Sequence, residues 1–179
     1  INEHLPTLYK YALEAESILE LGVRGAVSSY ALMYGLASNS FERKSIFYND
    51  IKPCNIEELE NLGSKLGIEV KKQWINDLNL KLEKKYDLIF IDTWHVYAQL
   101  IRELNKFAPF ANKYIILHDT MVDGIQGEAL RLKQNYLILS QLSGFPINEI
   151  TKGLKPAINN FLNKNPEWKI KIVYENNNG

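Results

Sequence analysis

The chain has 179 residues, which is enough for one domain with a sizeable hydrophobic core. Hydrophobic residues make up 46% of it and charged residues 23%, and 21 basic side chains balance 21 acidic ones. Because the chain has no net positive charge, and no apolar run approaches the roughly 20 residues of a membrane helix, we expect neither a nucleic-acid partner nor a membrane anchor.

Helical and strand patterns alternate along the first third of the chain. Apolar residues at helical spacing predict an opening amphipathic helix over Leu5–Leu13. Ser17–Leu21 is a short, mostly apolar run that ends at Gly22, and it predicts a buried strand followed by a turn. The helical period then resumes over Val27–Leu36, and a second strand is expected over Ser45–Asn49.

The middle of the chain opens with a capping box, in which Asn55 is followed three residues later by Glu58. This pattern predicts the start of a helix, and Gly67 is suited to end that helix. A third strand is expected over Ile68–Ile75. Tyr86–Ile91 is nearly all apolar and predicts a fourth strand that is covered on both faces, as in the centre of a parallel sheet.

The last part of the chain continues this alternation. A helix is expected over Leu100–Phe107 and a fifth strand over Lys113–Leu117. Two helical stretches follow, around Glu128–Leu142 and Lys155–Asn163. Trp168–Glu175 alternates between apolar and polar residues and predicts a sixth strand.

The repeated alternation of strands and helices predicts the fold class. It is typical of an α/β fold with a doubly wound, mostly parallel sheet and helices on both faces. The Asn178-Gly179 pair predicts a hairpin turn after the sixth strand. A final antiparallel strand is therefore expected to be missing from these residues.

The ends of the chain and its single cysteine bear on its context. The chain starts at Ile1 rather than at a methionine. We therefore expect residues 1–179 to be a single domain cut from a longer protein, whose other domains are candidate partners. Cys54 cannot form an internal disulfide, and no signal peptide is evident, which fits a cytoplasmic protein.

Polar residues or glycine follow each of the first five predicted strands. They are Gly22, Asp50, Asn76-Asp77, Asp92 and His118-Asp119. Because ligands bind outside the carboxyl ends of the strands in open α/β sheets, we expect these residues to line one acidic crevice. A single aspartate there would fit an ordinary turn, but four in succession favour a binding site.

The glycine loop joins the first strand to the helix that follows it. Gly22 and Gly25 allow a ligand to approach the backbone closely, and the helix N-terminus offers free amides. The loop lacks the G-x-G-x-x-G pattern of dinucleotide-binding folds. Glu20 disfavours a phosphate and suits a cation, such as the ammonium group of an amino acid. The alternative interpretation is a plain strand-to-helix turn.

Two further strand ends are suited to a nucleoside. Asp50 can accept hydrogen bonds from both hydroxyls of a ribose, as acidic residues at this position do in dinucleotide folds. Asp77 can accept a hydrogen bond from an adenine amino group, with Ile51 and Ile75 as apolar walls. The alternative for both aspartates is a capping or turn role.

Together, these residues resemble the class I S-adenosylmethionine-dependent methyltransferases. The stretch Glu20–Ser29, which reads ELGVRGAVSS, is similar to the cofactor loop of a small-molecule branch that includes sugar-type O-methyltransferases with Asp-x-x-His and His-Asp-Thr motifs. The other matching segments are Phe90–His95, Ile116–Thr120, Gly153–Ile158, Phe161-Leu162 and Pro166–Trp168. The resemblance runs from about Ser17 to the end of the chain, and it implies a Rossmann-like methyltransferase fold.

The resemblance also implies how S-adenosylmethionine would be held. Glu20 and the backbone from Gly22 to Gly25, followed by Ser28, would hold the methionine part. Asp50 would hold the ribose. The remaining cofactor positions are Ile51, Asp77 and Asp92, with Asp77 at the adenine end.

In relatives that use a metal, carboxylates after the fourth and fifth strands coordinate a divalent cation. Those positions are Asp92 and Asp119 here, and Mg²⁺ or Mn²⁺ is the implied ion. Members of the catechol type carry Asp-Asn after the fifth strand, whereas this chain has His118-Asp119. His118 is therefore one candidate for the third ligand, and the alternative is a core histidine bonded to backbone.

The implied catalytic residues are His95 and Asp92. The metal would hold the acceptor hydroxyl and lower its pKa, and His95 would act as the general base. A helix-capping or supporting role for His95 is the alternative.

The predicted function is S-adenosylmethionine-dependent O-methylation of a small polar acceptor, with a sugar or glycan preferred. Trp74, Trp94 and Tyr97 suggest exposed aromatic side chains that would suit a polyol. One alternative is a nicotinamide-dependent oxidoreductase, against which the missing glycine and Glu20 both argue. The other is a non-catalytic module that binds a nucleoside. The oligomeric state is left open.

Overall fold

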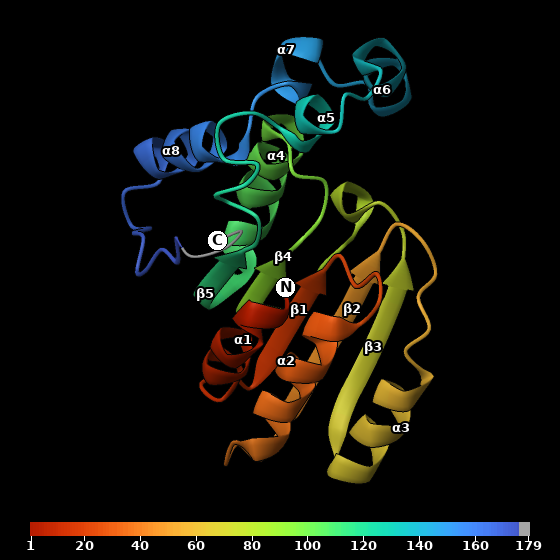
Figure 1. The fold of residues 1–179 in the computed structure, drawn as a ribbon. Coiled ribbons are helices and arrows are strands. Elements are labelled where there is room, and N and C mark those ends of the chain that lie inside the picture. Colours follow the sequence, from red (N-terminus) through yellow and green to blue (C-terminus); the bar gives the residue numbers. More distant parts are fainter. Residues whose placement is uncertain (176–179) are drawn as a thin grey trace. The chain divides into compact units, whose positions relative to one another are not determined.

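A single five-stranded sheet organises the chain. The computed structural model describes residues 1–175, and its strands lie in the order β3-β2-β1-β4-β5 (Figure 1). Their bounds are Ser17–Leu21 for β1, Lys44–Asp50 for β2, Ile68–Trp74 for β3, Tyr86–Ile91 for β4 and Ala111–Leu117 for β5.

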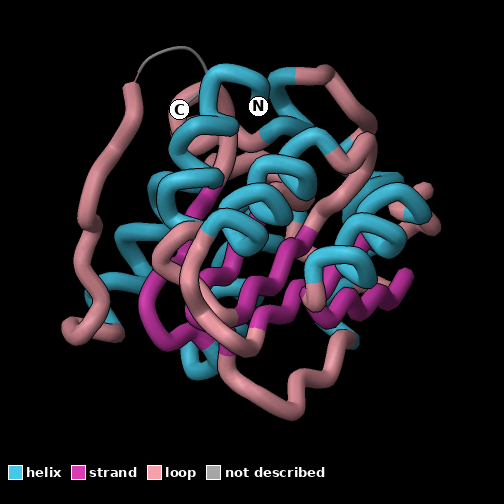
Figure 2. The backbone as a smooth tube through the Cα atoms, turned by 90° about the horizontal axis from the view of Figure 1, so that it is seen from below, coloured by secondary structure: helices cyan, strands magenta, loops and turns pink. Residues whose placement is uncertain are grey.

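The strand order confirms the predicted fold class. β1 pairs in parallel with both β2 and β4, and β2 pairs in parallel with β3. The chain runs outward from β1 to β3 and then continues on the other side of β1, so the strand order reverses at β1. Such a reversal is the mark of a doubly wound, Rossmann-like sheet. In Figure 2 the strands lie side by side in a single layer.

The chain divides into two compact units, which we describe one at a time. The first contains Ile1–Asp92 and Pro109–Ile116, and the second contains Thr93–Ala108 and Leu117–Gly179. Three short 3₁₀ helices, Asn2–His4, Asp77–Asn79 and Ala108–Phe110, supplement the longer helices. Within the described residues, each helix is too short or too polar to cross a membrane.

The first unit packs three helices on one face of the sheet (Figure 1). They are α1 (Leu5–Ala12), α2 (Val27–Ser38) and α3 (Glu57–Leu66). Alternate strand residues supply the core beneath them: Ile18, Ile46, Tyr48, Ile68, Leu88 and Phe90. Each fully buried apolar side chain of this kind contributes about 1.5–3 kcal/mol through removal from water. All six residues of β4 are buried, as its nearly all-apolar sequence predicted.

The helix α3 ends as predicted but begins differently. Gly67 adopts a left-handed conformation with φ of 67°, which closes the helix. The predicted capping box does not form, because the N-cap is Ile56. Asn55 Oδ1 accepts a bond from the Glu57 amide, and Glu58 accepts one from the hydroxyl of Tyr30 instead of reaching back to the helix start.

The second unit is made of helices and the loops between them. Its helices are α4 (Tyr97–Phe107), α5 (Glu128–Arg131), α6 (Tyr136–Ser143), α7 (Ile147–Ile150) and α8 (Leu154–Lys164). The single helical stretch predicted around Glu128–Leu142 is therefore two helices. Asn135 separates them, since its side chain caps α6 by accepting bonds from the amides of Leu137 and Ile138.

The predicted sixth strand over Trp168–Glu175 is wrong. These residues contain no strand and run as a loop toward the end of the chain (Figure 2). Ile170 and Ile172 remain 57% and 52% exposed. Alternation of apolar and polar residues indicates which side chains could face a core. A strand also needs a neighbouring strand that pairs with its backbone hydrogen-bonding groups. The hairpin turn predicted at Asn178-Gly179 lies outside the described residues.

Candidate functional site

The glycine loop leaves β1 with several left-handed residues. Gly22 has φ of 90° and donates its amide to the Asn49 carbonyl at 2.9 Å. Arg24 and Ala26 also have positive φ, at 46° and 60°. A Cβ added to Gly25 would meet no atom within 4 Å. Packing within the protein therefore does not require glycine at position 25, and the space beside it is open to a ligand.

Asp50, directly after Asn49 in β2, holds this loop in place. Its Oδ2 accepts hydrogen bonds from the amides of Val23 and Arg24, both at 2.9 Å, and its Oδ1 accepts one from Lys52 at 3.0 Å. Burial acts to raise the pKa of Asp50, but the three backbone bonds outweigh it and the pKa is lowered. The loop amides are thus paired with an ionised carboxylate.

Glu20 lies beneath the loop rather than on its surface. It is fully buried, and its Oε1 accepts a hydrogen bond from the Ser28 hydroxyl at the start of α2. Burial raises its pKa to about 8, against the hydrogen bonds of Ser28 and Ser29 and with the help of the nearby carboxylates of Asp92 and Asp50. Near neutral pH the side chain is thus mostly a neutral acid, unlike the carboxylate that the sequence suggested.

The remaining strand ends of the first unit differ in exposure. Ile51 is 66% exposed, so its apolar side chain is accessible to a ligand. Asp77 is buried, and its Oδ1 accepts a bond from the Leu78 amide at 2.8 Å. The Asp92 amide donates to the Leu21 carbonyl at 2.9 Å, which extends the pairing of β1 and β4. The predicted cofactor residues all belong to this unit: Glu20, Gly22, Gly25, Ser28, Asp50, Ile51, Asp77 and Asp92.

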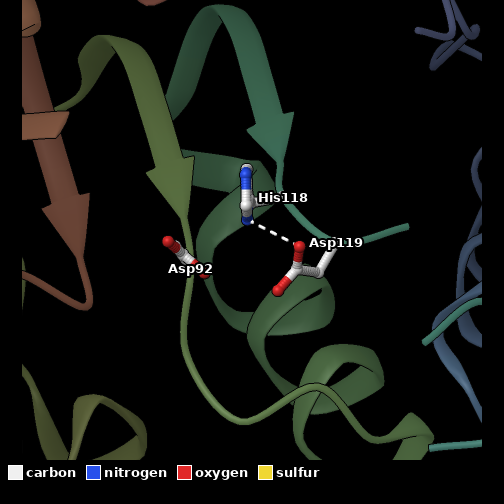
Figure 3. Close-up of side chains that lie close together, drawn as sticks. All are labelled: Asp92, His118 and Asp119. Atoms are coloured by element: carbon white, nitrogen blue, oxygen red, sulfur yellow. Dashed lines mark ion pairs between the residues drawn. The ribbon is translucent and has the colours of Figure 1, made fainter. Parts of the chain in front are cut away.

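The other predicted residues follow β5 or precede α4. Figure 3 shows Asp92 after β4, and His118 and Asp119 after β5. In the second unit, His118 Nδ1 lies 3.1 Å from Asp119 Oδ1, and His118 is buried. Asp119 adopts a left-handed conformation with φ of 54°. Its other oxygen, Oδ2, lies 3.2 Å from Nδ1 of His95, so Asp119 bridges two histidines.

His95 lies among more carboxylates than the sequence suggested. Its Nδ1 is 3.4 Å from Asp123 Oδ2 and 3.9 Å from Glu128 Oε2, in addition to Asp119. Two hydrogen bonds also join His95 and Glu128: the Glu128 amide donates to the His95 carbonyl, and the His95 amide donates to the side-chain oxygen Oε2 of Glu128. Ligand atoms of His95, Asp119 and Asp123 lie within 4.8 Å of one another, a spacing that a metal ion could bridge.

Arg131 compensates the charge of Asp123. Its Nε and Nη2 donate to the two oxygens of this buried carboxylate at 2.6 and 2.9 Å. Burial acts to raise the pKa of Asp123, but hydrogen bonds from His95 and Arg131 outweigh it and lower the pKa. Sequence reasoning missed Asp123, Glu128 and Arg131. The four-residue spacing from Asp119 to Asp123 was the available signal, because the Asp123 amide bonds to the Asp119 carbonyl.

The Gly153–Ile158 motif has a clear structural role. The amides of Leu154 and Lys155 donate to the carbonyls of Asp123 and Gly124 at 2.9 and 2.8 Å. A Cβ on Gly153 would lie 2.3 Å from the Asp123 carbonyl oxygen, so the backbones can approach this closely only at a glycine. The motif thus docks the start of α8 against the loop that carries Asp123.

We expect Gly153→Ala to lower the free energy of unfolding by roughly 1–3 kcal/mol, because the added methyl group must push the two backbone segments apart. Denaturant unfolding measures this change. Asn159→Ala, at an exposed position on the same helix, is the control and should leave stability within about 0.5 kcal/mol. Equal stability of the two variants would contradict the close approach at Gly153.

The three aromatic side chains expected to be exposed are only partly so. Trp74 is half-buried and packs against the core of the first unit. Trp94 stacks on Phe145, with ring centroids 6.3 Å apart and planes 15° from parallel. The Tyr97 hydroxyl accepts a bond from the Asn160 side chain at 2.7 Å. These rings are engaged within their own units and give no support for a sugar platform.

Comparison with known proteins identifies the fold. No protein-family model matches the chain, and no curated protein matches it in sequence. Three solved structures show the same architecture. Cofactor-bound Rv0187 from MTB is 18% identical, with a TM-score of 0.52 over 69% of this chain and 58% of that chain. The N-methyltransferase NodS from Bradyrhizobium japonicum WM9 is 11% identical, with a TM-score of 0.56 over 91% and 80%. The O-methyltransferase TomG from Streptomyces achromogenes, in complex with SAM, is 14% identical, with a TM-score of 0.51 over 80% and 69%.

The chain has the fold of a methyltransferase. This confirms the fold that the resemblance implied. At these identities the likeness shows the fold alone, and the chain spans 58% of the length of Rv0187. The sugar-type branch, the metal and the role of each site residue therefore stay predictions. NodS is described as an N-methyltransferase and TomG as an O-methyltransferase. The comparison therefore does not decide whether the acceptor atom is nitrogen or oxygen.

Proposed function

We propose that the chain binds S-adenosylmethionine in its first unit and transfers the methyl group to a hydroxyl of a small polar acceptor, with a sugar or glycan preferred. The observation that carries this proposal is the pairing of Asp50 with the amides of Val23 and Arg24. A pyrophosphate would need such amides free and would be repelled by the ionised carboxylate. The loop is therefore suited to a ligand without phosphate, such as this methyl donor.

The other residues of the first unit fit the parts of the cofactor. The open space beside Gly25 admits the methionine part close to the backbone. Glu20 and Ser28 are bonded to each other beneath the loop and keep the end of β1 and the start of α2 together. Asp50 retains lone pairs for a ribose hydroxyl. The exposed side chain of Ile51 offers an apolar surface for adenine, and Asp77 lies after β3 at the adenine end.

The reaction needs alignment and removal of one proton. When bound, S-adenosylmethionine supplies a methyl group on a positively charged sulfur, which an oxygen nucleophile displaces in line. In this proposal His95 accepts the proton of the acceptor hydroxyl as a general base. Asp92, the residue directly after β4, is the second catalytic residue of this proposal and would lie beside the methyl donor.

The proposal includes a divalent cation that assists the reaction. Oxygen ligands from Asp92 and Asp119 suit Mg²⁺ or Mn²⁺, whereas a nitrogen ligand from His118 suits Mn²⁺ better. The ion would supply positive charge that stabilises the deprotonated acceptor oxygen. His118 Nδ1 lies 3.1 Å from Asp119 Oδ1, so a metal held by both side chains would have to replace this contact.

Calorimetric titration with S-adenosylmethionine, S-adenosylhomocysteine and NADH tests the proposal. We expect both sulfur nucleosides to bind and NADH not to bind. Gly25→Ala should weaken binding about tenfold or more, a loss of about 1.4 kcal/mol, because its methyl group fills space that the ligand needs. The unfolding midpoint should not change, since that methyl group meets no protein atom. Binding of NADH alone would refute the proposed function.

A further inference from the structure

Hydrogen-bond directions around His95 indicate which of its ring nitrogens carries a proton. The neighbours of Nδ1 are oxygens of Asp119, Asp123 and Glu128. An ionised carboxylate can only accept hydrogen bonds, so Nδ1 must be the donor in this group. Arg131 donates one hydrogen bond to each oxygen of Asp123, which is the pairing of a guanidinium with an ionised carboxylate. A proton on Nδ1 leaves Nε2 as the nitrogen with a lone pair in the neutral ring.

Asp123 is the most firmly held of these carboxylates. Its side chain is fully buried, and Arg131 contacts both of its oxygens. Its backbone is fixed as well, since the amide bonds to Asp119 and the carbonyl accepts from Leu154. Asp119 lies slightly closer to Nδ1 but is 19% exposed and shares its charge with His118. A buried carboxylate that accepts two hydrogen bonds from one arginine has a fixed position and is suited to orient a histidine ring.

We propose that Asp123, clamped by Arg131, is a positioning residue that holds His95 with its Nδ1 proton toward the loop carboxylates and its Nε2 toward the acceptor. This inference rests on the proposed function, in which His95 is the general base. It adds two residues that act through His95 and do not touch the substrate. It also explains the Gly153 motif, which anchors the loop that carries Asp123.

The same geometry argues against a metal ion held by His95, Asp119 and Asp123. A metal would need the Nδ1 lone pair, which the proton occupies. The charge of Asp123 is already paired with Arg131. The cluster is therefore better described as a hydrogen-bonded acid–base pair than as a metal site.

Nitrogen NMR of isotope-labelled histidine tests the proposal without any acceptor. The chain has three histidines, and His95→Gln assigns the signal of interest. In the wild-type chain we expect Nδ1 of His95 to be protonated. Asp123→Asn should reduce the preference for that proton position about tenfold, because a bond to a charged acceptor is replaced by one to a neutral amide. Glu149→Gln is the matched control, since Glu149 pairs with Arg102 elsewhere in the same unit at 2.8 Å, and it should leave the His95 signal unchanged.

Two results would overturn the proposal. One is an unprotonated Nδ1 of His95 in the wild-type chain, and the other is an unchanged preference for the Nδ1 proton in Asp123→Asn. Kinetics gives a second readout, because Asp123→Asn should lower kcat about 10²-fold while KM for the methyl donor is unchanged. If the chain binds no S-adenosylmethionine but the Nδ1 proton depends on Asp123, the proposed function fails and the positioning role stands.

Discussion

Replacing His95 by alanine is expected to lower kcat for methyl transfer about 10²- to 10⁴-fold, the range that a general base contributes. The affinity for S-adenosylmethionine should stay the same, because the predicted cofactor residues belong to the first unit and His95 to the second. Release of S-adenosylhomocysteine, measured with a panel of sugars and glycans as acceptors, gives the rate. Calorimetric titration of the variant gives the affinity.

The alternative role of His95 predicts a different result. If His95 only supports the start of α4, its replacement by alanine should lower the unfolding midpoint and affect the rate through loss of folded protein. His4→Ala is a suitable control, since it removes a histidine from a short 3₁₀ helix of the first unit. A His95→Ala variant that is stable and retains full activity would exclude the general-base role.

The fold could be predicted from sequence where burial alone decides the structure. The bounds of β4 are as predicted, because five of its six residues are apolar and such a run suits a central strand that is covered on both faces. The sixth strand could not be assessed in the same way. Trp168–Glu175 has the alternation of a strand, but whether it forms one depends on a neighbouring strand that the local pattern cannot specify.

The candidate site was predictable to a similar extent. The strand ends and the glycine loop could be located, since parallel strands bring their carboxyl ends to one edge of the sheet. The clamp of Arg131 on Asp123 could not, because two oppositely charged residues eight positions apart are common on any surface. The interaction becomes informative only once Asp123 is known to be buried. The state of Glu20 likewise depends on its burial and not on its place in the ELGVRG motif.

We expect the free energy of unfolding to depend strongly on pH, because Glu20 is buried. Burial raises the pKa of this side chain from 4.5 to about 8 in the folded chain. Between these pH values the folded state binds one proton more than the unfolded state, so the free energy of unfolding falls as pH rises. The stability that the protonated side chain provides is fully present below about pH 4.5 and is lost as pH rises through about 8. At about 1.4 kcal/mol per pH unit, the total loss is about 5 kcal/mol.

Glu20→Gln should remove most of this dependence. The amide is neutral at every pH, has nearly the same shape, and retains an oxygen that can accept the Ser28 hydrogen bond. We expect the variant and the wild type to be similarly stable at about pH 5, and the variant to be more stable by several kcal/mol at about pH 9. Urea unfolding across this range measures the difference. Glu69→Gln, at an exposed position on β3, is the control and should leave the pH dependence unchanged. If Glu20→Gln and wild type lose stability in parallel as pH rises, Glu20 is already ionised in the folded protein, and the methionine end of the cofactor would then meet a carboxylate instead of a neutral acid.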